Sequence, residues 1–348
     1  MIQIDGKRLG REYEPYVIAE LSANHGGSIA RAKASIFAAK NAGASAVKIQ
    51  TYTPDTMTID CDKEDFQIKS GLWEGYNLYK LYSEAYTPFE WHNDLFNYAR
   101  EVGITLFSTP FDESAVDLLE SLNTPAYKVA SFELTDLPLI EYVAKKKKPI
   151  LVSTGMGSAE EIAEALQAIK RCGNDQILLF HCISSYPAPT EESNLNNLKY
   201  LSNEFDVLVG LSDHSISNVA ATAAIALGAV AIEKHFKLDE DDCGPDSSFS
   251  ILPSEVSQLV EACSQAWLSL GTGFFTRSEV ETSNAKFRRS LYFVKDLAVG
   301  DVVSKNDIRR IRPGFGLPPK FNDAVLGKRL LRSVQRGDPV RWECFKEE

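Results

Sequence analysis

The chain contains two apolar runs that end in ionisable side chains: Val207-Leu-Val-Gly-Leu-Ser-Asp-His214 and Ala229-Val-Ala-Ile-Glu-Lys-His-Phe236. Short apolar runs of this kind form strands that are buried on both faces of a parallel sheet. A charge at the end of such a strand is costly unless it is paired or used. The two runs therefore predict parallel strands whose carboxyl ends contribute to a functional site.

Six further apolar runs, which end in polar or ionisable side chains, precede these two in the chain. They are residues 17–21, 46–52, 105–109, 126–131, 149–154 and 177–182. Amphipathic segments with helical spacing lie between the runs, and alternation of strands with helices is typical of α/β proteins. Eight parallel strands with polar carboxyl ends predict a (β/α)8 TIM barrel with an active site at those ends.

The length of the chain predicts a second domain. A barrel typically has about 250 residues, whereas this chain has 348, and its pattern changes after residue 271. We predict a TIM-barrel catalytic domain over residues 1–271, a linker over 272–289 and a small β-rich domain over 290–348, with a second strand at 302–303. An aromatic-rich insert at residues 53–87 is long enough to act as a lid or as a subunit contact.

Composition excludes several classes of protein. The net charge of −11 argues against nucleic acid as a partner, because such binding needs basic patches. None of the six cysteines forms a CxxC pair, which favours a reduced, cytoplasmic protein. No apolar run approaches the roughly 20 residues that span a bilayer, so we expect no membrane association.

Two histidines end the runs quoted first. Neighbouring barrel strands lie about 4.8 Å apart, so His214 and His235 can face one point. Either histidine alone would more often bond a backbone carbonyl, but two on adjacent strands favour a divalent metal such as Mn²⁺, Zn²⁺ or Fe²⁺.

Two lysines, Lys48 and Lys128, protrude from the second and fourth runs. With the nearby strand-end hydroxyls they predict a site for phosphate or carboxylate, although a single lysine could instead form a Schiff base. Glu20 ends the first run, where it serves either as an acid/base or as an ion-pair partner of Lys48. Asp246 follows the last run and can bind a substrate hydroxyl.

Eight ordered motifs resemble those of the sialic acid synthase family. They lie at residues 18–28, 47–51, 107–111, 127–131, 153–156, 210–214, 233–236 and 244–246. The tail from Ser290 onward, with Arg312-Pro-Gly-Phe-Gly, is similar to the antifreeze-like (SAF) domain of that family. Residues 48–58 and 130–133 are most similar to the branch of pseudaminic acid synthases.

The resemblance implies a transferase that condenses phosphoenolpyruvate with an open-chain acylamino sugar and water, and that releases phosphate by C–O cleavage. For the pseudaminic acid branch, the sugar is 2,4-diacetamido-2,4,6-trideoxy-L-altrose. The alternatives are synthesis of N-acetylneuraminate or legionaminate and, more remotely, a Schiff-base aldolase.

The resemblance also implies roles for individual residues. Those for phosphoenolpyruvate are Lys48, Thr109, Lys128, Ser131, Ser153 and Ser212. Those for the sugar are Glu20, which is also the acid/base candidate, Tyr186 and Asp246, with Gln50 near the sugar or the metal. His214 and His235 would hold Mn²⁺, with Mg²⁺ or Co²⁺ as alternatives. Arg312 would reach the sugar in the partner subunit of a domain-swapped homodimer. At Ser184 the family has an amide side chain, so this contact must differ.

Overall fold

The computed structural model describes residues 2–242, 244–274 and 276–345. The chain forms two compact units, Met1–Gly271 and Thr272–Glu348. Cys243 and the last three residues of the expected C-terminal domain lie outside the described residues. The other five cysteines are free thiols.

Eight parallel strands of the first unit close into a barrel, in the order β10-β3-β4-β5-β6-β7-β8-β9. Their bounds are β3 Tyr16–Glu20, β4 Ala46–Thr51, β5 Thr105–Pro110, β6 Tyr127–Val129, β7 Ile150–Ser153, β8 Ile177–Cys182, β9 Leu208–Asp213 and β10 Ala231–His235. Almost every residue of these strands is buried, as their apolar sequences require. The predicted TIM barrel is confirmed.

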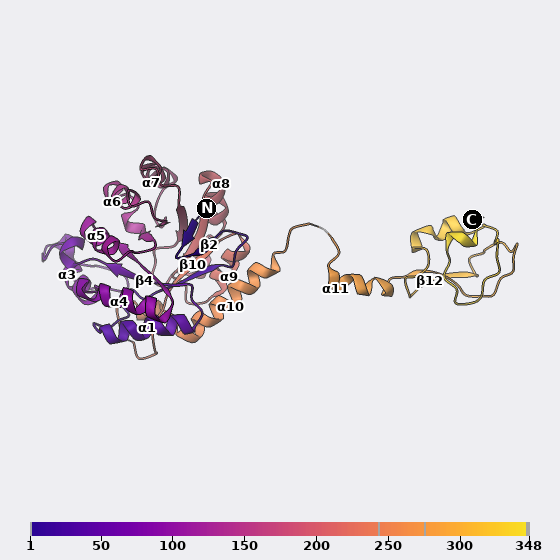
Figure 1. Cartoon of the computed structure of the whole chain (residues 1–348), viewed down its shortest axis with the longest axis horizontal. Helices are drawn as coiled ribbons and strands as arrows, with labels where there is room; N and C mark the ends of the chain where they lie inside the picture. The colour runs from indigo at the N-terminus through magenta and orange to yellow at the C-terminus, as the bar shows by residue number, and fades with distance from the viewer. Residues whose placement is uncertain (1, 243, 275, 346–348) are drawn as a thin grey trace. The chain divides into compact units, whose positions relative to one another are not determined.

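Helices surround the strands (Figure 1). They are α1 Ile29–Asn41, α2 Pro54–Met57, α3 Leu78–Ala85, α4 Phe89–Val102, α5 Glu113–Ser121, α6 Leu137–Ala144, α7 Ala159–Arg171, α8 Asn196–Phe205, α9 Val219–Ala226 and α10 Pro253–Ser269. Side-chain caps define several starts; Ser158 and Glu161, for example, form a capping box at α7. Within the described part of the chain, no helix combines the length and the apolar character needed to cross a membrane.

A short hairpin precedes the barrel. Strands β1 Ile2–Ile4 and β2 Lys7–Leu9 pair around an Asp5-Gly6 turn, in which both residues have positive φ. The apolar side chains of the hairpin pack with Phe107 and with residues from the beginnings of the barrel strands. One end of the barrel is therefore filled by an apolar cluster, which leaves the carboxyl ends of the strands for function.

The second unit is built around a small antiparallel sheet. Strands β11 Ser290–Phe293 and β12 Ile308–Ile311 pair over an apolar core that includes Leu291, Val325 and Val340. The helical segments are α11 Glu279–Thr282, η5 Ser283–Phe287, η6 Pro319–Phe321, α12 Asn322–Val325 and η7 Trp342–Cys344. The expected strand at residues 302–303 is wrong, because Val302 forms only an isolated bridge with Arg329 and the second strand lies at β12.

Candidate active site

The carboxyl ends of the barrel strands gather most of the polar side chains that the sequence singled out. Within strands lie Glu20, Lys48, Gln50, Thr109, Lys128, Ser153, Ser212 and His235; directly after strands or in the following loops lie Ser131, Tyr186, His214 and Asp246. Arg312 instead follows β12 of the second unit, where its side chain is exposed.

Lys48 forms a buried ion pair with Glu20. Its Nζ lies 2.6 Å from Glu20 Oε2 and donates a hydrogen bond of 3.0 Å to Thr109 Oγ1. Burial raises the pKa of Glu20 to about 7, although Lys48 opposes this shift. Burial alone would lower the pKa of Lys48, but Glu20 and Glu233 raise it. Glu20 is therefore paired and also has a pKa suited to proton transfer near neutral pH.

Lys128 lies close to a second carboxylate, Glu233. Lys128 Nζ donates to Ser153 Oγ at 2.6 Å, and burial lowers its pKa against the opposing effect of Glu233. Glu233 lies 3.9 Å from the ammonium groups of both Lys48 and Lys128, and Ser212 donates to it at 3.0 Å. Burial would raise the pKa of Glu233, but the two lysines lower it. Two ammonium groups are thus held in place, with hydroxyls beside them, where an anion can be bound.

A glycine next to Ser153 and Thr154 leaves room beside these groups. A Cβ on Gly155 would lie 2.9 Å from Ser131 Oγ and 2.8 Å from Cys182 Sγ, and it would also collide with Ser184 Oγ. Ser184 Oγ is buried and has no hydrogen-bond partner among the described residues. An unpartnered buried hydroxyl facing such a space is a feature of a ligand site. Sequence reasoning missed Gly155, since a glycine after a strand more often marks a turn.

The two histidines face each other. The ring centroids of His214 and His235 lie 5.4 Å apart, and His214 Nδ1 is within 2.9 Å of the Ile183 carbonyl. Burial lowers the pKa of both rings, and His214 lowers that of His235 further. His235 Nδ1 is buried, has no hydrogen-bond partner in the described structure and lies 3.7 Å from Asp246 Oδ2. Both imidazoles are therefore neutral at neutral pH, as metal ligands must be.

The donor set fits a divalent metal with open positions. The described residues contain no group of three or more His, Cys, Asp or Glu side chains arranged to hold a metal. Two imidazoles would thus supply only part of the coordination of a divalent metal, and water and substrate would supply the rest.

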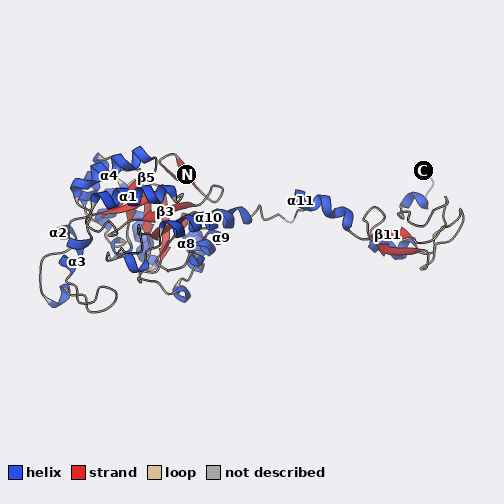
Figure 2. Ribbon diagram, turned by 90° about the horizontal axis from the view of Figure 1, so that it is seen from below, coloured by secondary structure: helices blue, strands red, loops and turns tan. Residues whose placement is uncertain are grey.

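A cavity of about 400 Å³ opens beside the histidines. Gln50, Tyr186, His235 and Asp246 are among the residues that line it, and the Tyr186 ring centroid lies 4.5 Å from that of His214. The insert at residues 53–87 also contributes to the lining. Its helices α2 and α3 lie next to each other at one edge of the barrel (Figure 2).

Lys234 is a residue that sequence reasoning did not assign. Its Nζ lies 2.7 Å from Asp213 Oδ2 and donates to the carbonyls of Ser215 at 2.5 Å and Ser217 at 3.2 Å. These contacts fix the loop that carries His214. The sequence did contain a signal for this role. Side chains alternate between the two faces of a strand, so if Glu233 and His235 face the barrel interior, Lys234 must face outward, where its buried ammonium group needs an acidic partner.

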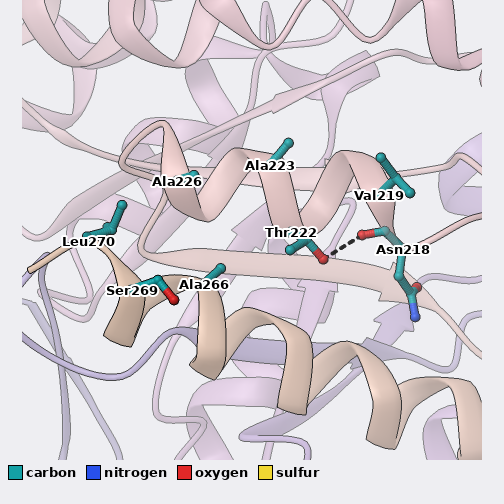
Figure 3. Close-up of a pocket in the computed structure, with 8 residues that line it drawn as sticks. All are labelled: Asn218, Val219, Thr222, Ala223, Ala226, Ala266, Ser269 and Leu270. Atoms are coloured by element: carbon teal, nitrogen blue, oxygen red, sulfur yellow. Dashed lines mark hydrogen bonds between the residues drawn. The ribbon is translucent and has the colours of Figure 1, made fainter.

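A second hollow, of about 570 Å³, lies between α9 and α10 (Figure 3). Its lining is Asn218, Val219, Thr222, Ala223, Ala226, Ala266, Ser269 and Leu270, and Thr222 Oγ1 donates to the Asn218 carbonyl at 2.8 Å. None of these side chains is ionisable. The hollow between α9 and α10 therefore has no acid, base or charged group for catalysis, and the candidate active site is the cavity at the carboxyl ends of the strands.

The family model for NeuB matches residues 35–274, and the model for the SAF domain matches residues 288–346. The chain belongs to the NeuB family. Among its relatives are the pseudaminic acid synthases of Campylobacter jejuni serotype O:2 (45% identical, over 95% of this chain and 96% of the relative) and Helicobacter pylori strain 26695 (42%, over 94% and 96%). The N,N'-diacetyllegionaminic acid synthase of Legionella pneumophila is 36% identical, over 97% and 96%.

Solved structures of similar fold include the spore coat polysaccharide biosynthesis protein SpsE of Bacillus subtilis (TM-score 0.68, 33% identity, covering 100% of this chain and 99% of that one). A sialic acid synthetase from Leptospira borgpetersenii, solved with citrate, has a TM-score of 0.74 at 27% identity, covering 82% and 95%. The resemblance drawn from the sequence and the expectation of an enzyme of the transferase type are confirmed.

Proposed function

We propose that this NeuB-family enzyme is a pseudaminic acid synthase. It condenses phosphoenolpyruvate with 2,4-diacetamido-2,4,6-trideoxy-L-altrose and water, and it forms pseudaminic acid and phosphate by C–O cleavage. The observation that carries the proposal is the placement of two buried lysines beside two neutral histidines at one end of the barrel. Relatives named pseudaminic acid synthase are more similar to this chain than those named for legionaminic acid, at 42–45% against 34–36% identity.

Phosphoenolpyruvate binds to the two lysines. Lys48 and Lys128 supply positive charge for its phosphate and carboxylate, and the hydroxyl groups of Thr109, Ser131, Ser153 and Ser212 lie beside them. At position 184 the family has an amide side chain. Here the hydroxyl group of Ser184, which has no hydrogen-bond partner among the described residues, takes the place of that amide. The burial of both lysines excludes water and strengthens their attraction to the anion.

The sugar binds in the neighbouring cavity, where Gln50, Tyr186 and Asp246 contact its hydroxyls. His214 and His235 would hold a divalent metal, for which Mn²⁺ is our first choice and Mg²⁺ or Co²⁺ the alternatives; such a metal would supply Lewis-acid polarisation of the aldehyde oxygen. Glu20 lies opposite His235 in the strand register and donates a proton to the aldehyde oxygen as carbon three of phosphoenolpyruvate bonds to the aldehyde carbon. Water adds to carbon two and gives one proton to the Glu20 carboxylate, which restores the acid. The hydroxyl formed at carbon two then becomes a carbonyl as phosphate leaves with the bridging oxygen, and the hydroxyl proton passes to the phosphate.

A second copy of the chain completes the site. Residues 288–346 carry 14 Lys and Arg against six Asp and Glu, a net charge of +8, which leaves −19 for the rest of the chain. This asymmetry favours docking of the basic domain on an acidic barrel, and it supports a domain-swapped homodimer in which Arg312 reaches the partner's sugar. Mixing Arg312→Ala and His235→Ala chains should then restore about one quarter of wild-type activity, because half of the dimers carry one intact site. If Arg312 served its own barrel, the mixture would stay inactive.

Metal-dependent phosphate release from phosphoenolpyruvate tests the function. We expect rapid release with 2,4-diacetamido-2,4,6-trideoxy-L-altrose and much slower release with N-acetylmannosamine. Release with N-acetylmannosamine alone would overturn the proposal in favour of the sialic acid branch. A cytoplasmic location, where phosphoenolpyruvate is made, follows from the same proposal.

A further inference from the structure

The cavity beside the histidines is lined by polar side chains, among them Gln50, His235 and Asp246, and by many apolar ones. The insert contributes four aliphatic side chains, which are Met57, Ile68, Leu78 and Leu81, together with Trp73, Tyr82 and Ala85. We call the four aliphatic side chains the apolar wall. Apolar lining is common in ligand sites, but a sugar surface that consists only of hydroxyl groups gains little from four aliphatic side chains.

Hydrogen bonds hold the apolar wall in place. Ile68 N donates to the Tyr76 carbonyl at 2.9 Å, and the Trp73 indole donates to the Pro245 carbonyl at 3.1 Å. Asn77 caps α3 through the backbone N–H of Tyr79 and also donates to the Cys61 carbonyl. The insert is therefore tied both to itself and to the loop that carries Asp246, so that its apolar side chains form a fixed surface.

Such a wall discriminates between sugar substituents. A methyl group gains free energy when it packs against apolar side chains, whereas a hydroxyl group buried there without a partner loses its hydration. The diacetamido-trideoxy sugar has a methyl at carbon six and two acetamido methyls. N-acetylmannosamine has a hydroxymethyl group and one acetamido methyl. The wall thus favours the first sugar over the second.

One polar group borders the wall. Glu133 in η2 (Ser131–Glu133) lines the same cavity, and its Oε2 is buried without a hydrogen-bond partner in the described residues. A carboxyl oxygen in this position can accept a hydrogen bond from an amide N–H. A sugar with a second acetamido group supplies such a donor together with another methyl group.

We propose that the insert is the specificity element of this enzyme, and that its apolar wall selects 6-deoxy sugars with two acetamido groups over sugars with a hydroxymethyl group. The proposal rests on the function proposed above and deepens it. The wall distinguishes substituents and not ring stereochemistry, so it separates this enzyme from N-acetylneuraminate synthesis but does not by itself separate altrose from another diacetamido-trideoxy sugar.

A pair of isoleucine variants in the insert tests the proposal. Ile68 lines the cavity, whereas Ile59 is 60% exposed and does not line it. Ile68→Thr should lower the ratio of kcat/KM for the altrose sugar to kcat/KM for N-acetylmannosamine by about tenfold or more, with the KM for phosphoenolpyruvate unchanged. Ile59→Thr is the matched control and should leave the ratio as in wild type.

Two failures can be told apart. If wild-type enzyme released no phosphate with the altrose sugar, the proposed function would fall. If wild type did so but Ile68→Thr left the ratio unchanged, or if Ile59→Thr changed it equally, only the role of the wall would be overturned. Circular dichroism melting of both variants establishes that each is folded when its ratio is measured.

Discussion

Replacement of Lys234 by methionine should have two effects: it should destabilise the barrel, and it should weaken the binding of the divalent metal proposed above. The side chains of Lys234 and Asp213 are only 1% and 4% exposed, so Lys234→Met leaves the Asp213 carboxylate buried without its counter-charge. Breaking a buried ion pair in this way costs about 3–5 kcal/mol. This is a large part of the roughly 5–15 kcal/mol that stabilises a typical domain. Urea unfolding of the full chain, followed by circular dichroism, measures the loss.

The double variant Asp213→Asn/Lys234→Met separates charge from packing. It has no buried unpaired charge, so it should recover most of the stability lost in Lys234→Met. Calorimetric titration with Mn²⁺ should still show weaker binding in both variants, because the loop that carries His214 has lost the ammonium that holds the carbonyls of Ser215 and Ser217. A loss below about 1 kcal/mol for Lys234→Met, or equal losses in both variants, would refute this reasoning.

Two further predictions concern the site. Gly155→Ala should raise the KM for phosphoenolpyruvate about tenfold, because the new methyl group collides with the side chains around the anion site; an unchanged KM would contradict this. Burial raises the pKa of Glu133 from 4.5 to about 7. The contribution of its bound proton to the free energy of unfolding is therefore fully present below pH 4.5 and is lost as the pH rises through 7. Glu133→Gln should therefore raise the free energy of unfolding by about 3 kcal/mol at pH 8 and by little at pH 4, and equal effects at both would be inconsistent with a raised pKa.

The barrel could be predicted because its strands are apolar on both faces and stop at polar residues. This pattern locates the end of every strand, and in a parallel barrel all such ends meet at one rim. Lys48 and Lys128 could thus be placed in one site from sequence alone. The Asp5-Gly6 turn gave a signal for the N-terminal hairpin, but strands of three residues each are stable only when they pack on other parts of the chain, and the sequence does not reveal that packing.

Other parts of the site depend on contacts between distant segments. The role of Gly155 follows from three side chains on two other segments, Ser131 after β6 and Cys182 and Ser184 at the end of β8, and no local pattern encodes that crowding. Glu133 has the sequence context of an exposed residue in a turn, and only the fold shows that it lines the same cavity as the insert. The insert contains the helices α2 and α3, but no pattern in its sequence indicates which of its side chains line that cavity. These features become visible only when the chain is folded.

The proposed enzyme condenses phosphoenolpyruvate with an acylamino sugar and breaks the bond between carbon two of phosphoenolpyruvate and the bridging oxygen. The most direct test supplies phosphoenolpyruvate labelled with oxygen-18 at its bridging position, together with Mn²⁺ and 2,4-diacetamido-2,4,6-trideoxy-L-altrose. Phosphorus NMR then reads the isotope shift of the released phosphate. We predict that the label appears in phosphate, in amounts equal to the pseudaminic acid formed. Unlabelled phosphate, or no release with this sugar, would contradict the account.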